Sequence, residues 1–124
     1  MNENQNEIGT QKSLDQLQTQ MDEQKREAQK NSRFRQIDSG KTAILRFTGK
    51  VYERTAQYEG MATVKLDFEL EETTPDGQHK VFSVGSKSAA AREIVRLLKL
   101  NRTTMSIGRS GEGKSTRYSV SEVE

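Results

Sequence analysis

The segment GRSGEGKS, residues 108–115, contains the residue types of a phosphate-binding loop. It matches G-x-x-x-x-G-K-[ST], the P-loop pattern of nucleotide hydrolases, in which loop amides and a lysine surround phosphate. A working P-loop also needs a helix that starts at the Lys-Ser end, because the helix N-terminus must face the phosphates. The segment TRYSVSEVE after Ser115 instead alternates β-favouring residues. The sequence therefore predicts the glycine-rich tip of a last β-hairpin and a protein that is not an enzyme.

Three cations surround this tip: Arg109, Lys114 and Arg117. A loop that carries cations can lie along a phosphodiester backbone without hydrolysing a nucleotide, because the contact needs only charge neutralisation. The alternative is a hairpin that is merely solvated. The sequence leaves both interpretations open.

No other group of residues points to catalysis, to a metal or to a cofactor. The chain has no cysteine, which removes thiolate ligands, disulfides and a thiol nucleophile. Its one histidine, His79, lies in a polar, turn-like segment and is expected at the surface. We therefore expect no catalytic site, no metal site and no cofactor.

Composition divides the 124 residues into two parts. Residues 1–32 are rich in Gln and Asn, carry six acidic and four basic side chains, and contain too few apolar residues to form a core. Residues 33–124 carry sixteen basic and twelve acidic side chains and can form one small domain. No apolar run is long enough for a membrane span or a signal peptide. We expect an intracellular, cytoplasmic protein, associated with the nucleoid if its ligand is single-stranded DNA.

The tail, residues 1–32, contains one candidate helix. Ser13 and Gln16 form a capping-box pattern, and Leu14, Leu17 and Met21 recur at helical spacing. The apolar row then ends, which is too short for a coiled coil. Residues 13–30 are therefore either a solvated helix on a disordered or partly helical tail, or a helix that binds a protein partner or a second copy.

Five strands and one helix are predicted in residues 33–124. Residues 42–54 form a long strand interrupted at Gly49, residues 62–71 alternate apolar and polar side chains, and the turn Pro75-Asp76-Gly77 leads to a third strand at 79–85. An amphipathic helix follows, with Ala91, Ile94, Val95 and Leu98 on one face. Ser86 or Ser88 can cap its start, and Asn101 can end it. Two short strands then flank the glycine-rich tip. The order is β-β-β-α-β-β.

This element order resembles the OB fold, a five-stranded Greek-key barrel with a helix between its third and fourth strands. The resemblance covers about residues 42–120 and includes the glycine that interrupts a long first strand. It implies a mainly β protein that binds single-stranded nucleic acid on strands two and three and on the loops between strands one and two and between strands four and five.

The candidate binding residues follow from that placement. The first such loop, residues 55–61, contains Tyr58, and the second is the glycine-rich tip. The face of the first strand that points away from the core presents cations and an aromatic ring, which suit phosphates and stacked bases. Tyr52 is either a stacking ring or a ring packed at the barrel rim, whereas Phe47, Phe68 and Phe82 are expected in the core. The expected nucleic-acid-binding residues are Arg46, Lys50, Tyr52, Arg54, Tyr58, Arg109, Lys114 and Arg117.

One row of residues opposes this interpretation. Asp67, Glu69 and Glu71 share the outward face of the second strand, where like charge would repel phosphate. The sequence therefore supports binding of single-stranded nucleic acid, DNA in the first instance, with little sequence preference. The alternative is an OB-like adaptor that binds another protein through the acidic face or the N-terminal helix.

Overall fold

The computed structural model describes residues 13–123. Within them, five strands form one antiparallel sheet in the order β4-β3-β2-β5-β6. The predicted mainly β fold, with its helix between the third and fourth strands, is confirmed. The strands are β2 (Thr42–Tyr58), β3 (Met61–Thr73), β4 (His79–Gly85), β5 (Thr104–Ser110) and β6 (Arg117–Glu122).

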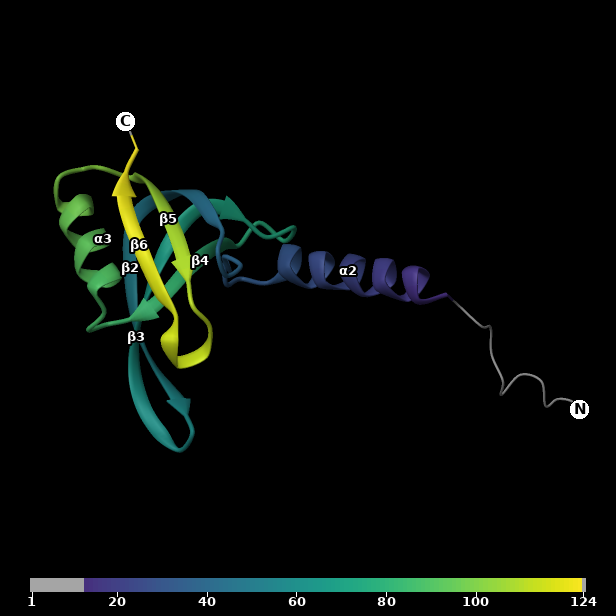
Figure 1. The fold of residues 1–124 in the computed structure, drawn as a ribbon. Coiled ribbons are helices and arrows are strands. Elements are labelled where there is room, and N and C mark those ends of the chain that lie inside the picture. Colours follow the sequence, from purple (N-terminus) through teal and green to yellow (C-terminus); the bar gives the residue numbers. More distant parts are fainter. Residues whose placement is uncertain (1–12, 124) are drawn as a thin grey trace, which may run out of the picture.

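The central strand β2 pairs with a different neighbour along each half of its length (Figure 1). Its first residues, Thr42 to Arg46, pair with β5, whereas Val51 to Tyr58 pair with β3. The register shifts between Phe47 and Val51, and Gly49 adopts a φ of +100°, a conformation that suits glycine. The predicted interruption at Gly49 is therefore a bulge, and it lets one strand bend between its two partners.

The sheet is open, so the predicted closed Greek-key barrel is not observed. β4 and β6 stand at opposite ends of the strand order and do not pair with each other in residues 13–123. The free side of β4 instead pairs with the chain that precedes β2. Phe34 forms a parallel bridge with Val81, whose backbone exchanges two hydrogen bonds of 2.8 Å with Arg33 and Arg35. We call residues 33–37 the strap; it occupies backbone groups of an edge that barrel closure would otherwise use.

The helix α3 (Ala89–Lys99) covers one side of the core. The Ser88 side chain accepts a hydrogen bond from the Ala91 amide, as predicted for a capping serine, and Asn101, just after the helix, has a φ of +61°. The buried face is slightly rotated from the predicted one, since Leu97 is buried and Val95 and Leu98 are only partly so. The three predicted core rings, Phe47, Phe68 and Phe82, are among the largest fully buried side chains, and Leu70, Ile94 and Met105 are buried with them.

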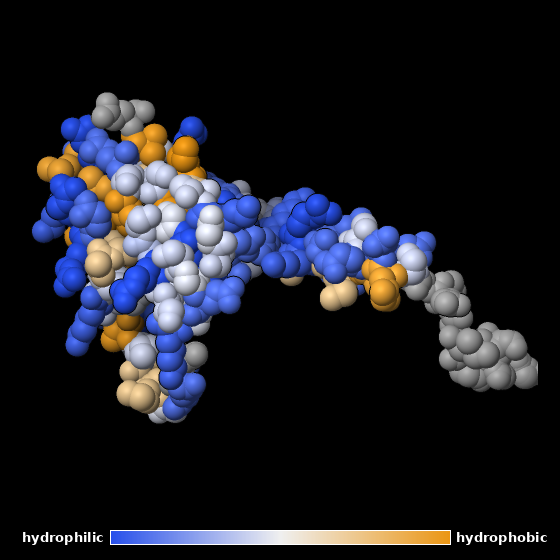
Figure 2. Space-filling model, in the orientation of Figure 1, coloured by the Kyte–Doolittle hydropathy of each residue, from blue (hydrophilic) through white to orange (hydrophobic). Residues whose placement is uncertain are grey.

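The N-terminal helix α2 (Leu14–Asn31) extends away from the sheet (Figure 1). Both hydrogen bonds of the predicted capping box are present, between Ser13 and Gln16. None of its residues is buried. Figure 2 shows a hydrophobic patch near its N-terminal end, where Leu14, Leu17 and Met21 are exposed. Neither α2 nor α3 is long and apolar enough to cross a membrane.

The P-loop-like segment forms the predicted hairpin. Gly108 to Ser110 end β5, Gly113–Ser115 make a single 3-10 turn, and β6 starts at Arg117. A strand therefore lies where a P-loop would place its helix.

Candidate nucleic-acid interface

A groove of about 580 Å³ lies between the strap and the sheet. We call it the sheet groove. Its cationic lining residues come from the strap, β2, β3 and β5: Arg35, Arg54, Lys65 and Arg109. Its aromatic lining residues are Phe34, Phe82 and Tyr118, and its remaining described lining residues include no aspartate or glutamate. Positive charge and aromatic rings thus share one concave surface.

Arg54 is the most constrained cation of the sheet groove. Its Nε and Nη2 donate hydrogen bonds of 2.8 and 3.2 Å to the Asp67 carboxylate, and Nη2 also donates to Ser83 Oγ at 3.0 Å. On its other side, the guanidinium lies 5.1 Å from the centre of the Phe34 ring, a cation–π distance. These contacts hold the guanidinium plane and the ring together at one edge of the groove.

The electrostatics of this pair favour the charged forms. Burial of Asp67 raises the pKa of its carboxyl, but the hydrogen bonds from Arg54 and Ser83 outweigh burial and hold the pKa below its ordinary value. The hydrogen bond to Asp67 in turn raises the pKa of Arg54. Asp67 is therefore a paired anion beneath the groove.

Arg109 and the aromatic rings form further parts of the lining. Arg109 Nη1 donates a 2.9 Å hydrogen bond to the carbonyl of Ile37, which fixes the side chain against the strap. The Tyr118 ring on β6 packs edge-to-face on Phe82, with their centres 5.2 Å apart. Phe82 is buried, whereas Phe34 is 39% exposed. Phe34 is thus the lining ring that offers the most surface to a ligand.

The acidic row on β3 is partly compensated by its neighbours. Asp67 is paired with Arg54, and Glu69 accepts hydrogen bonds from Thr48 at 2.9 Å and from the Tyr52 hydroxyl at 3.5 Å. Glu71 remains exposed. In the described structure a cation therefore pairs only with Asp67 of this row, and Glu69 and Glu71 keep negative charge that would repel phosphate on this face.

Only two of the eight predicted binding residues line the sheet groove, Arg54 and Arg109. Tyr52 lies on the same face, 46% exposed. Lys114 lies 3.8 Å from Glu59, so the glycine-rich tip reaches the turn between β2 and β3. Arg46, Lys50 and Arg117 are exposed outside the groove. Tyr58 ends β2, and its side chain lies outside the described part of the structure.

Five of the cationic and aromatic lining residues were not among the predicted binding residues: Phe34, Arg35, Lys65, Phe82 and Tyr118. The sequence carried a signal for two of them, because Phe34 stands between Arg33 and Arg35 in an aromatic-cation pattern. Lys65 carried a weaker one, as a lysine on the polar face of a strand. Tyr118 packs partly against the core, where an alternating β6 places it beside Val120.

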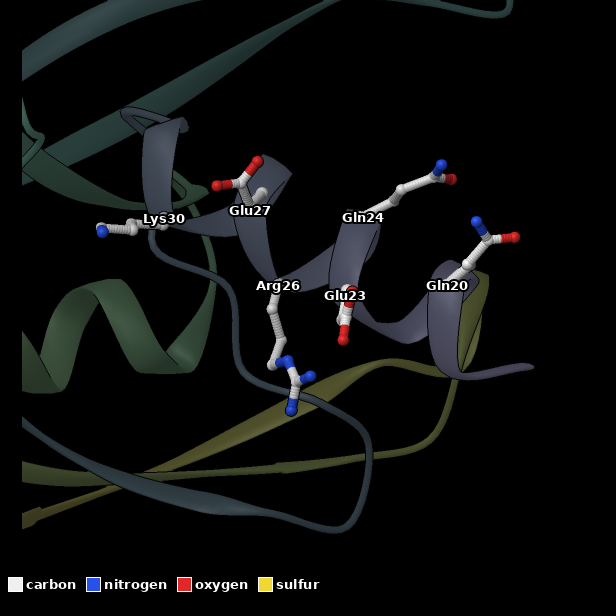
Figure 3. A pocket seen from close by; sticks show the side chains of 6 residues that line it. All are labelled: Gln20, Glu23, Gln24, Arg26, Glu27 and Lys30. Carbon is white, nitrogen blue, oxygen red and sulfur yellow. The ribbon is translucent and has the colours of Figure 1, made fainter. Parts of the chain in front are cut away.

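Other parts of the described structure form no comparable candidate site. Residues 13–123 contain no group of three or more His, Asp or Glu side chains that could hold a metal ion. His79 Nδ1 lies 2.8 Å from the Leu70 carbonyl, a structural contact at the start of β4. A hollow of about 600 Å³ on α2 is lined only by side chains of that helix, which point in different directions (Figure 3). Since no second element encloses it, we do not treat it as a site.

Comparison of the chain with protein-family models, curated proteins and solved structures finds no match.

Proposed function

We propose that the protein binds single-stranded nucleic acid, DNA in the first instance, without catalysing a reaction. The observation that carries the proposal is the sheet groove, in which four cations and three aromatic rings line a concave surface free of carboxylates. Lys and Arg neutralise phosphates, while exposed rings stack on bases with little regard to sequence. Little sequence preference is therefore expected.

The position of the groove supports the resemblance to the OB fold. That family is a partly open five-stranded barrel that binds oligonucleotides on its second and third strands and on two loops. The corresponding elements here are β3, β4, the turn between β2 and β3 and the loop between β5 and β6. Lys65 on β3, Ser83 on β4 and Thr116 after the glycine-rich tip all line the groove.

Fluorescence anisotropy with a labelled single-stranded oligonucleotide, measured from about 50 to about 200 mM salt, tests the proposal. We expect an affinity that falls steeply with salt, and a weaker interaction with the matching duplex. Lys65→Gln should reduce the slope of log K against log salt by about 0.7, the value for one phosphate contact on a single strand. Arg92→Gln removes an exposed cation of α3 and should leave the slope unchanged. Absence of binding at low salt, or binding indifferent to salt, would refute the proposal.

A second candidate function is that of a protein adaptor, and the exposed row on α2 favours it. Leu14 is 83% exposed and Met21 61%, on a helix that has no buried residue. Leu17→Gln together with Met21→Gln should then abolish a protein complex or a dimer seen by light scattering, with oligonucleotide binding unchanged. An unaltered mass and an unaltered set of bound proteins would remove this candidate.

A further inference from the structure

A second basic hollow adjoins the sheet groove. It has a volume of about 610 Å³ and lies between the last turns of α2 and the hairpin that joins β3 to β4. We call it the arm cleft. Four cations line it, Arg26, Lys30, Arg35 and Lys80, and its one carboxylate is that of Glu72.

The carboxylate of the arm cleft is already shared between two cations. Glu72 lies 3.3 Å from Arg35 Nε and 3.3 Å from Lys80 Nζ. Lys80 is buried, and its Nζ also donates a 3.0 Å hydrogen bond to the Gln29 carbonyl in the last turn of α2. This contact attaches the end of α2 to β4, and it caps a carbonyl at the negative end of the helix dipole. The cleft therefore presents an excess of three positive charges.

The arm cleft and the sheet groove share a wall. Arg35 and Gln36 of the strap line both. A nucleic-acid strand that leaves the sheet groove over Arg35 would therefore enter the arm cleft directly and meet Arg26 and Lys30 on α2. Figure 3 shows Lys30 and Arg26 extending from the helix in different directions.

The lining of the cleft favours a phosphodiester backbone over a protein. Protein interfaces have an apolar centre. The described lining of the arm cleft holds no aliphatic or aromatic side chain apart from Pro75, and the exposed apolar row Leu14, Leu17 and Met21 does not line it. Cations without apolar surface suit a ligand that carries regularly spaced negative charge.

We propose that the arm cleft continues the phosphate track of the sheet groove, so that α2 contacts single-stranded nucleic acid through Arg26 and Lys30. The inference rests on the proposed function: α2 extends the binding site, so that the protein contacts a longer stretch of the strand. A short oligonucleotide fills the sheet groove alone, and a longer one also reaches the arm cleft.

Anisotropy titrations with labelled oligothymidylates of increasing length, each over a salt series, test this inference on the full chain. For the wild type, the slope of log K against log salt should become steeper as the oligothymidylate lengthens and should then reach a plateau. The double variant Arg26→Gln/Lys30→Gln should reach a plateau lower by about 1.4, two phosphate contacts, and should bind the shortest oligonucleotide as the wild type does. The control Lys25→Gln/Arg92→Gln removes equal charge outside the cleft and should keep the wild-type plateau.

The outcomes separate the two proposals. A wild type that binds no oligonucleotide refutes the proposed function, and this inference with it. A wild type that binds, with equal plateaus for both double variants, refutes the inference alone. Saturable binding of poly-L-glutamate that is lost in Arg26→Gln/Lys30→Gln, with oligothymidylate binding unchanged, would reassign the cleft to an acidic protein. Circular dichroism should show equal helix content in all variants.

Discussion

Arg54 on β2 donates two hydrogen bonds to the buried carboxylate of Asp67 on β3, at 2.8 and 3.2 Å, while its guanidinium lies over the Phe34 ring. The pair thereby links the strap to the sheet. The Asp67 side chain is 5% exposed and that of Arg54 39%. Loss of the partner should therefore cost more stability when Asp67 is the residue left behind, because water can solvate Arg54 but not Asp67.

Arg54→Met should destabilise the fold more than Asp67→Asn does. The first change leaves a buried carboxylate with only Ser83 as a partner, which costs about 2 kcal/mol. The second leaves a cation that can turn toward water. Urea unfolding measures both. The double variant Arg54→Met/Asp67→Leu should recover part of the loss, because it removes both charges; a double variant less stable than Arg54→Met would contradict this account.

Asp67 should also make stability depend on pH. Its pKa is lower in the folded protein than the ordinary value of about 3.9 in the unfolded chain. The unfolded state therefore binds the proton first, so the stabilisation is fully present above about pH 4 and disappears as pH falls through the lower folded pKa.

Unfolding free energies of the wild type and Asp67→Asn, measured from pH 7 to strongly acidic pH, test this dependence. The difference between the two proteins should be constant near neutrality and should shrink below about pH 4. A difference that stays constant down to the lowest pH would show that the carboxylate contributes nothing through its charge.

Phe34→Ala should weaken oligonucleotide binding by about 1–3 kcal/mol, the contribution of stacking one base. The effect should be similar for different base sequences, and the salt slope should remain that of the wild type, because no phosphate contact is lost. Anisotropy at fixed salt measures the affinity. The control is Val51→Ala, which shortens an exposed apolar side chain on β2, outside the sheet groove. Equal affinities for the two variants would remove Phe34 from the interface.

Gly111→Ala should destabilise the hairpin tip more than Gly113→Ala. Both glycines have positive φ, +76° and +55°, which costs an alanine about 1–2 kcal/mol. At Gly111, a Cβ would also lie 2.1 Å from the Ser115 carbonyl oxygen, whereas no atom lies within 4 Å at Gly113. Amide hydrogen exchange in β5 and β6, together with urea unfolding, compares the two. Equal protection in both variants would contradict the steric contribution.

The sequence by itself determined the elements of this protein. Alternation of apolar and polar side chains located β3, and glycine marked the bend of β2. A serine at 86 or 88 and Asn101 bounded α3, because each of these signals acts over a few residues. The core rings Phe47, Phe68 and Phe82 followed from the same alternation. The turn residues of GRSGEGKS, with β-favouring residues after them, likewise identified a hairpin where the letters alone suggested a P-loop.

Only the tertiary structure decided which side chains share a site. Periodicity assigns a residue to a face of a strand, but its neighbours depend on register, which the bulge between Phe47 and Val51 sets. The bridge from Phe34 to Val81 joins residues far apart in the chain, and it closes one wall of the groove while leaving the sheet open. Such pairings depend on the geometry of the whole sheet, and no local pattern encodes them.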